Sequence, residues 1–294
     1  MLREGLDGVR IPSGCAVSAI FSKSGERRSG EDIIKSIALM HDRSNGLGGG
    51  FAAYGIYPEY KNLYALHVFY EGKGPKDVCE AFINEHFDVV NLSKIPTRKT
   101  PAIKDEPLIW RYFVEPLHTK LAESQLDEDT FVSRCVIRVN SQIEGAYIFS
   151  SGKDMGVFKA VGYPEDVGEF YRLEDYKGYC WTAHGRYPTN TPGWWGGAHP
   201  FALLDRSVVH NGEISSYDAN RRAIESTASR LPVALRSSAS AKLYQKWSKT
   251  PELRGFRGFS FSNGLTQFDR TKPLLTRFLW VKWWTTTPKR GLMG

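Results

Sequence analysis

The sequence predicts an α+β protein in which two antiparallel sheets are flanked by helices. Strand-like and helix-like segments follow one another without the regular βαβ alternation that marks a parallel sheet. The chain has no internal repeats. Of its 294 residues, 41% are hydrophobic and 13% aromatic, enough apolar material for a substantial buried core.

Elements in the first half are predicted from the spacing of apolar residues. The helix after the first strand is clearest, because Ile33, Ile37 and Met40 recur on one face and a glycine cluster at 45–50 then ends it. The predicted segments are strands at 15–21, 51–56, 62–70 and 107–116, and helices at 31–43, 75–87 and 126–142. We expect the strands on either side of residues 57–61 to run antiparallel to each other.

In the second half, a long irregular loop separates two groups of elements. Residues 184–201 are crowded with Gly, Pro, His, Arg and Trp, a composition typical of a structured loop that carries function. The predicted segments are a strand pair at 145–151 and 156–162, a short helix at 164–172, a strand at 179–183, an apolar strand from 201 into an Asn-Gly pair, and a helical start at 215–225.

Positive charge is concentrated at one end of the chain. The net charge is +7, yet residues 226–294 hold 13 Lys and Arg against 2 acids, whereas residues 1–225 hold 26 basic and 30 acidic side chains. The body is mildly acidic, so nucleic acid is an unlikely partner for it. We expect residues 1–14 to be a leader that is removed, 15–225 to be the functional domain, and 226–294 to be an atypical tail, frameshifted or disordered.

Location and metal binding are predicted from what the composition lacks. No run of about 18 apolar residues could span a membrane, and residues 1–14 have no apolar signal region, so a cytoplasmic location is expected. Cys79, Cys135 and Cys180 lie in apolar or helical stretches and are expected to be small buried hydrophobes. No cysteine or carboxylate spacing completes a zinc site, so we expect no metal.

Cys15 is the candidate nucleophile. It follows Ser13-Gly14 and opens a strand-like run. If the preceding bond is cut, its free α-amino group, with a reference pKa of ~7.7 to 8.0, can act as general base for its own thiol. A buried structural thiol is the alternative interpretation.

Three more residues suit acyl transfer from an amide. Asn211 and Gly212 end an apolar strand, where a side-chain amide and a backbone N–H can stabilise an oxyanion. An ordinary hairpin turn is the alternative for this pair. Arg186, in a Pro-rich loop, can hold a carboxylate with two hydrogen bonds, or it is a surface guanidinium.

Five motifs follow one another in the chain: Cys15 opening a strand, the Arg43-Ser44-Asn45-Gly46 turn, HGRYPTN from His184, Ala198-His199-Pro200, and VVHNGEIS from Val208. In order and spacing they resemble the motifs of class II glutamine amidotransferases. The likeness covers about residues 10–225 and is greatest to the stand-alone amidotransferase subunit of glutamate synthase. It implies the four-layer αββα sandwich of N-terminal nucleophile hydrolases.

The resemblance also implies a role for each site residue. Cys15 would attack the side-chain amide of L-glutamine, and Asn211 with Gly212 would form the oxyanion hole. Arg186 would hold the glutamine carboxylate. The pocket would also be lined by Thr189 and Asn190, and Arg43 would brace the nucleophile. His184, His199 and His210 would be structural. The chain would need no cofactor, and its partner would be a glutamate synthase-type subunit that carries FMN and iron–sulfur clusters.

The family pattern stops just past Arg222. An aspartate motif that binds the glutamine amino group is expected there and is missing. Either a shifted reading frame or a basic segment that binds nucleic acid or an anionic partner accounts for the tail. Three functions therefore remain open: an amidotransferase, an N-terminal nucleophile amidase that acts on another amide, and a catalytically impaired or inactive relative whose tail binds a partner.

Overall fold

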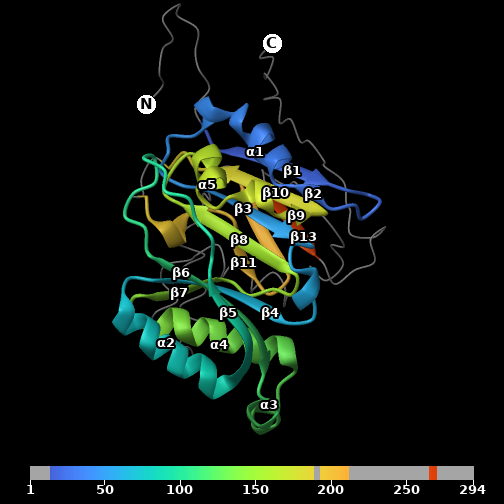
Figure 1. Ribbon diagram of the computed structural model, residues 1–294, viewed down its shortest axis with the longest axis vertical. Helices are drawn as coiled ribbons and strands as arrows, with labels where there is room; N and C mark the ends of the chain where they lie inside the picture. The colour runs from blue at the N-terminus through green and yellow to red at the C-terminus, as the bar shows by residue number, and fades with distance from the viewer. Residues whose placement is uncertain (1–13, 189–192, 212–264, 270–294) are drawn as a thin grey trace, which may run out of the picture.

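Four layers make up the protein (Figure 1). The computed structural model describes residues 14–188 and 193–211 in full and the backbone of 265–269. Two four-stranded antiparallel sheets lie face to face. Helices α1 (Glu31–Ala38) and α5 (Pro164–Phe170) cover one sheet, and α2 (Lys73–His86) and α4 (Glu128–Gln142) cover the other. The predicted αββα sandwich is confirmed.

The first sheet positions Cys15 and Arg186 of the predicted site. Its strands, in spatial order, are β1 (Ala16–Phe21), β10 (Cys180–Gly185), β3 (Gly49–Tyr54) and β8 (Met155–Ala160). Ala16 pairs with Gly185, and Gly185 pairs with Gly49. The start of β1, the end of β10 and the start of β3 therefore meet at one end of the sheet.

The second sheet shows why the sandwich is stable. Its strands, in spatial order, are β5 (Phe87–Lys94), β6 (Leu108–Pro116), β4 (Tyr64–Tyr70) and β7 (Ala146–Ser150). Every residue of β4 is buried. Leu66 and Val68 pack toward α2 and α4, whereas Ala65 and Phe69 pack toward the first sheet. Because strand side chains alternate between faces, one strand contributes to both hydrophobic layers.

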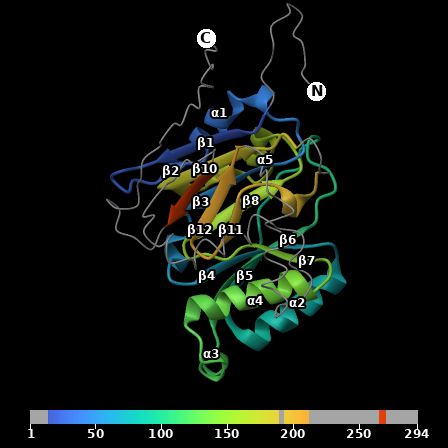
Figure 2. The same cartoon turned by 180° about the vertical axis from the view of Figure 1, so that it is seen from behind.

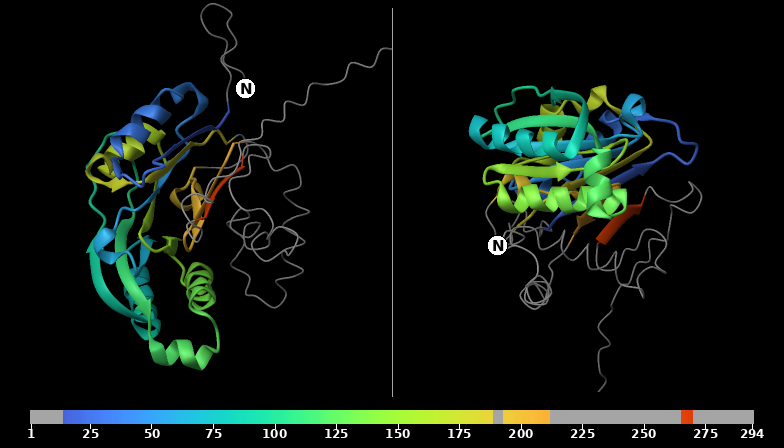
Figure 3. Two further views of the ribbon diagram at one scale, coloured as in Figure 1. Left: turned by 90° about the vertical axis from the view of Figure 1, so that its right-hand side faces the viewer. Right: turned by 90° about the horizontal axis from the view of Figure 1, so that it is seen from below.

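Smaller elements complete the architecture. A hairpin of β11 (Phe201–Leu203) and β12 (Arg206–His210), extended by β13 (Leu265–Asp269), lies on the reverse side of the sandwich (Figures 2 and 3). The rest are β2 (Arg28–Ser29) paired with β9 (Lys177–Gly178), α3 (His118–Ser124), and 3-10 turns η1 (His41–Arg43), η2 (Pro58–Tyr60), η3 (Leu173–Asp175) and η4 (Trp195–Gly197). In the described part of the chain, each helix is too short or too polar to cross a membrane.

The two predicted strand pairs are wrong, because their members belong to different sheets. β3 and β8 lie in the first sheet and β4 and β7 in the second, so the chain crosses between sheets twice. The crossings are joined by Asp154, whose backbone O accepts from Gly55 N at 2.7 Å and whose Oδ1 accepts from Tyr57 N at 2.8 Å. Alternation shows which faces a strand buries, but it does not show which strand lies beside it.

Other departures concern ends and turns. The predicted strand from residue 201 is a hairpin, whose turn places Leu204 at φ 52°. The predicted helix at 31–43 ends at Ala38, with a 3-10 turn after it. The sequence did not predict β5 or α3. The helical start at 215–225 lies outside the described residues.

Candidate active site

Cys15 differs from the other three cysteines in its surroundings. It lies immediately before β1 and is half-buried, whereas Cys79, Cys135 and Cys180 are buried. Burial raises the pKa of Cys79 to about 11 and that of Cys135 to about 12, and it raises the pKa of Cys180 further. These three thiols stay protonated at neutral pH, so Cys15 is the one whose position suits a nucleophile.

Arg186 lies beside Cys15. Because Ala16 pairs with Gly185, the next residues outward are Cys15 and Arg186. The Arg186 N–H donates to Gly48 O at 2.8 Å, and its carbonyl accepts from Ser44 Oγ at 2.9 Å. Burial lowers the pKa of Arg186, and the charge of Cys15 opposes that shift. Backbone bonds thus hold a partly desolvated guanidinium close to the candidate nucleophile.

Glycines make room for this arrangement. A Cβ on Gly48 would lie 2.8 Å from Arg186 Cδ and 3.3 Å from Ala198 Cβ, and its φ of 149° also disfavours other residues. A Cβ on Gly50 would overlap the carbonyl oxygen of His199. The glycine cluster therefore does more than end a helix, because it clears the surface of β3 for the Arg186 side chain and the loop above it.

Arg43 contacts the main chain on which Cys15 sits. Its Nε donates to the Cys15 carbonyl oxygen at 3.4 Å. A Cβ on Gly14 would lie 3.5 Å from the Arg43 guanidinium, so the side chain runs along both residues. Arg43 is thus in contact with the main chain on which Cys15 lies.

Asn211 reaches the same end of the sheet by way of β12. The preceding residue, His210, accepts a hydrogen bond at its carbonyl from His184 Nε2 at 2.8 Å. His184 lies opposite Val17 on β1, two residues from Cys15. The structure thus brings Cys15, Arg43, Arg186 and the main chain before Asn211 together. The other predicted site residues, Gly212, Thr189 and Asn190, lie outside the described residues.

The histidines in this region are packed as neutral rings. The rings of His184 and His199 stack with centroids 4.3 Å apart. Burial lowers the pKa of His184 to about 4 and that of His199 well below its usual value. Since His184 Nε2 donates to a carbonyl, its proton is on that nitrogen. These contacts suit the structural role expected for them.

Lys159 was not among the predicted site residues. It lies on β8 and pairs with Gly50 of β3. Gly50 pairs in turn with His184 of β10. Its side chain is fully buried, and its Nζ donates to Gly196 O at 2.9 Å and to Pro200 O at 3.5 Å. The sequence signal was a lysine in the otherwise apolar run GVFKAVG.

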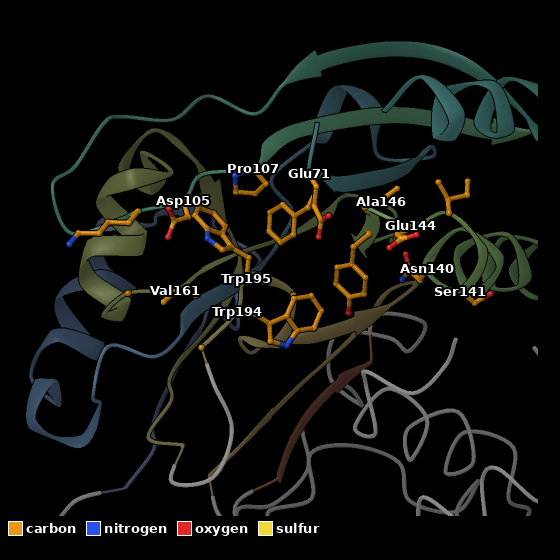
Figure 4. A pocket seen from close by; sticks show the side chains of 18 of the residues that line it. Glu71, Asp105, Pro107, Asn140, Ser141, Glu144, Ala146, Val161, Trp194 and Trp195 are labelled. Carbon is orange, nitrogen blue, oxygen red and sulfur yellow. The ribbon is translucent and has the colours of Figure 1, made fainter. Parts of the chain in front are cut away.

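A cavity of about 930 Å³ is lined in part by the loop that follows residue 192 and in part by Tyr147. Trp194 and Trp195 line it together with Glu71 and Glu144 (Figure 4). Cys15, Arg186 and Asn211 do not line it. Within the described ranges, no three His, Cys, Asp or Glu side chains gather to hold a metal ion.

Comparison with known proteins gives two matches. Residues 71–248 match the family described as glutamine amidotransferases class-II, a range that includes Arg186 and Asn211 but not Cys15 or Arg43. An uncharacterized protein of Archaeoglobus fulgidus is 53% identical over 214 residues, which are 72% of this chain and 56% of the relative. The matched segment thus spans little more than half of that relative.

Proposed function

Because this chain belongs to the class II glutamine amidotransferase family, we propose that it hydrolyses L-glutamine to glutamate and ammonia, with Cys15 as the nucleophile. The observation that carries the proposal is the meeting of Cys15, Arg186 and the end of β12 at one end of one sheet. An amide held there lies between a thiol, a guanidinium and an asparagine.

In the proposed mechanism, removal of residues 1–14 frees the α-amino group of Cys15. That amine takes the thiol proton, the sulfur attacks the amide carbon, and the oxyanion is stabilised by Asn211 and Gly212. The amine then returns the proton to the amide nitrogen, the carbon–nitrogen bond breaks and ammonia leaves, and water hydrolyses the thioester to glutamate and the free thiol.

Substrate recognition is proposed to depend on Arg186. A guanidinium forms two parallel hydrogen bonds with a carboxylate, as the α-carboxylate of an amino acid requires. Thr189 and Asn190 would line the same pocket, and Arg43 would hold the Cys15 main chain in place. Partial desolvation of Arg186 strengthens such a bond, because fewer waters compete for the guanidinium.

We also propose that the ammonia passes to a synthase partner of glutamate synthase type, which would carry FMN and iron–sulfur clusters. The proposal is supported by the likeness of residues 185–201 and 210–217 to the stand-alone amidotransferase subunit of such systems. Copurification of a flavin-containing subunit with the tagged protein would test it.

The glutaminase proposal is tested by glutamate release from L-glutamine, using protein whose N-terminus has been determined by mass spectrometry. We expect Cys15→Ala to lower kcat by at least about 10³-fold, because no other group replaces the nucleophile. Cys135→Ala is the matched control, since that thiol is buried with a raised pKa and should leave kcat unchanged.

Equal activity in the Cys15→Ala variant and the wild type would reject Cys15 as nucleophile. Cys15-dependent cleavage of other amides, with glutamine untouched, would instead favour an N-terminal nucleophile amidase of different specificity.

A further inference from the structure

Lys159 is a buried cation that lacks the usual reason for burial. Its side chain is fully buried on β8, and burial lowers its pKa to about 7. The charge that acts on it in the described part of the chain is a second cation, Arg186, which lowers the pKa further. Burying a lysine without a carboxylate partner is unfavourable, so we expect Lys159 to serve a purpose other than stability.

Lys159 Nζ donates its hydrogen bonds to one segment of the loop, and it lies over the rings of Tyr147 and Phe149 on β7, whose centroids are 5.5 and 5.9 Å away. Nζ donates to the carbonyls of Gly196 and Pro200, four residues apart, and lies 4.9 Å from the centroid of the Phe201 ring. An ammonium has three donors and a neutral amine has two, so both protonation states can bind both carbonyls. Lysine therefore binds the two ends of the segment 196–200 to β8.

This segment crosses the face of the first sheet next to the site. Gly50 leaves room for the His199 carbonyl, and the His199 ring stacks on His184, whose Nε2 binds the carbonyl of His210. Ala198 lies within reach of Gly48, over which the Arg186 side chain extends. The segment that Lys159 binds is thus in contact with the neighbours of both Arg186 and Asn211.

We infer that Lys159 is a positioning residue for the proposed glutaminase reaction: by holding the segment 196–200 against β8, it keeps Arg186 and Asn211 in register with Cys15. The inference rests on the proposed function. It assigns to Lys159 the alignment of Arg186 and Asn211 in that site. Lys159 itself touches neither Cys15 nor substrate.

The first test separates alignment from the chemistry of the thiol. Lys159→Met keeps the length and loses the donors, and we expect KM for glutamine to rise about tenfold while kcat changes less than about threefold. Alkylation of Cys15 by a chloromethyl ketone analogue of glutamine should slow about tenfold, whereas alkylation by iodoacetamide, which needs no Arg186, should not change. Lys177→Met, at an exposed position on β9, is the matched control.

The second test does not depend on activity. Hydrogen–deuterium exchange of peptides covering residues 194–203 should become at least about tenfold faster in Lys159→Met, while exchange in β3 is unchanged. If Lys159→Met does not fold, Lys159→Gln, which keeps an NH₂ donor group on a shorter chain, should show the same changes to a smaller degree.

The inference would be overturned by a folded Lys159→Met variant in which three quantities match the wild type. They are KM for glutamine, the rate of Cys15 alkylation by the glutamine analogue relative to iodoacetamide, and hydrogen–deuterium exchange of residues 194–203. A wild type that neither releases glutamate nor reacts with the glutamine analogue would instead reject the proposed function, while the exchange measurement would still decide whether Lys159 holds the loop.

Discussion

At the scale of single residues, burial holds ionisable groups in the protein interior in unusual protonation states. His67, on β4, shows the pattern: its Nε2 is 2.9 Å from Tyr57 Oη and its Nδ1 is 2.9 Å from the carbonyl oxygen of Val157, and burial lowers its pKa to about 3. His184 behaves in the same way. Such rings are neutral at working pH, so the cations around the site come from Arg186 and Arg43 and, in part, from Lys159.

Lys159 should also make stability depend on pH. Its pKa is about 7 in the folded protein and 10.5 by the reference value, so between these pH values the unfolded chain binds more protons. The free energy of unfolding should therefore rise as pH increases from 7 toward 10, with a slope of at most about 1.4 kcal/mol per pH unit. Urea unfolding at pH 6, 8 and 9.5 should show this rise in the wild type relative to Lys159→Met, and parallel pH profiles would contradict it.

At the scale of elements, the site depends on how closely a loop approaches β3. Gly50 on β3 and Gly48 just before the strand both face that loop. The β11–β12 hairpin is joined to the last residue of β3 by a hydrogen bond of 2.6 Å between Tyr54 Oη and Ser207 Oγ. Strand β3 thus carries the loop at one end and the hairpin at the other.

Gly50→Ala should therefore be destabilising as well as harmful to activity. The new Cβ would overlap the His199 carbonyl and lie 2.7 Å from Lys159 Cβ, and backbone cannot move aside as a flexible side chain can. We expect a loss of about 1–3 kcal/mol in urea unfolding. Gly74→Ala is the control, since nothing lies within 4 Å of its Cβ, and it should be neutral or stabilising by up to about 1 kcal/mol. Equal effects of the two changes would refute the close approach.

At the scale of the whole molecule, aromatic side chains join the two sheets. Phe149 on β7 is 2% exposed and stacks on Phe69 of β4, with ring centroids 3.8 Å apart. Both belong to the hydrophobic cluster that includes Phe51 and Phe158 of the first sheet. The packing of the sheets, and with it the position of β8 under the loop, depends on this layer.

Phe149→Ala should cost about 3–5 kcal/mol, because it leaves a cavity between two sheets that cannot close around it. Against a typical total stability of about 5–15 kcal/mol, that loss brings the protein close to unfolding. Chemical denaturation would measure it beside Val78→Ala, whose side chain is 58% exposed on α2 and should matter by less than about 0.5 kcal/mol. A small effect of Phe149→Ala would mean that the sheets repack.

The sequence by itself determined the layers, the positions of most helices and strands, and the candidate nucleophile. These follow from local patterns, since apolar spacing reports which faces are buried and a cysteine after Ser-Gly is visible without a fold. Cys15, Arg186 and Asn211 could be named because each carries a recognisable chemical group in a motif. Their roles remain proposals, and Gly212, Thr189 and Asn190 lie outside the described residues.

Only the tertiary structure decided which strands are neighbours and how the loop is held. Residues 51–56 and 62–70 are both mainly apolar runs, yet the strands they form lie in different sheets, because an apolar run indicates burial and does not show which strand is the neighbour. Lys159 and Gly50 owe their importance to the carbonyls of a loop far along the chain. Contacts of that kind leave no periodic trace in the sequence, so they appear only when the chain has folded.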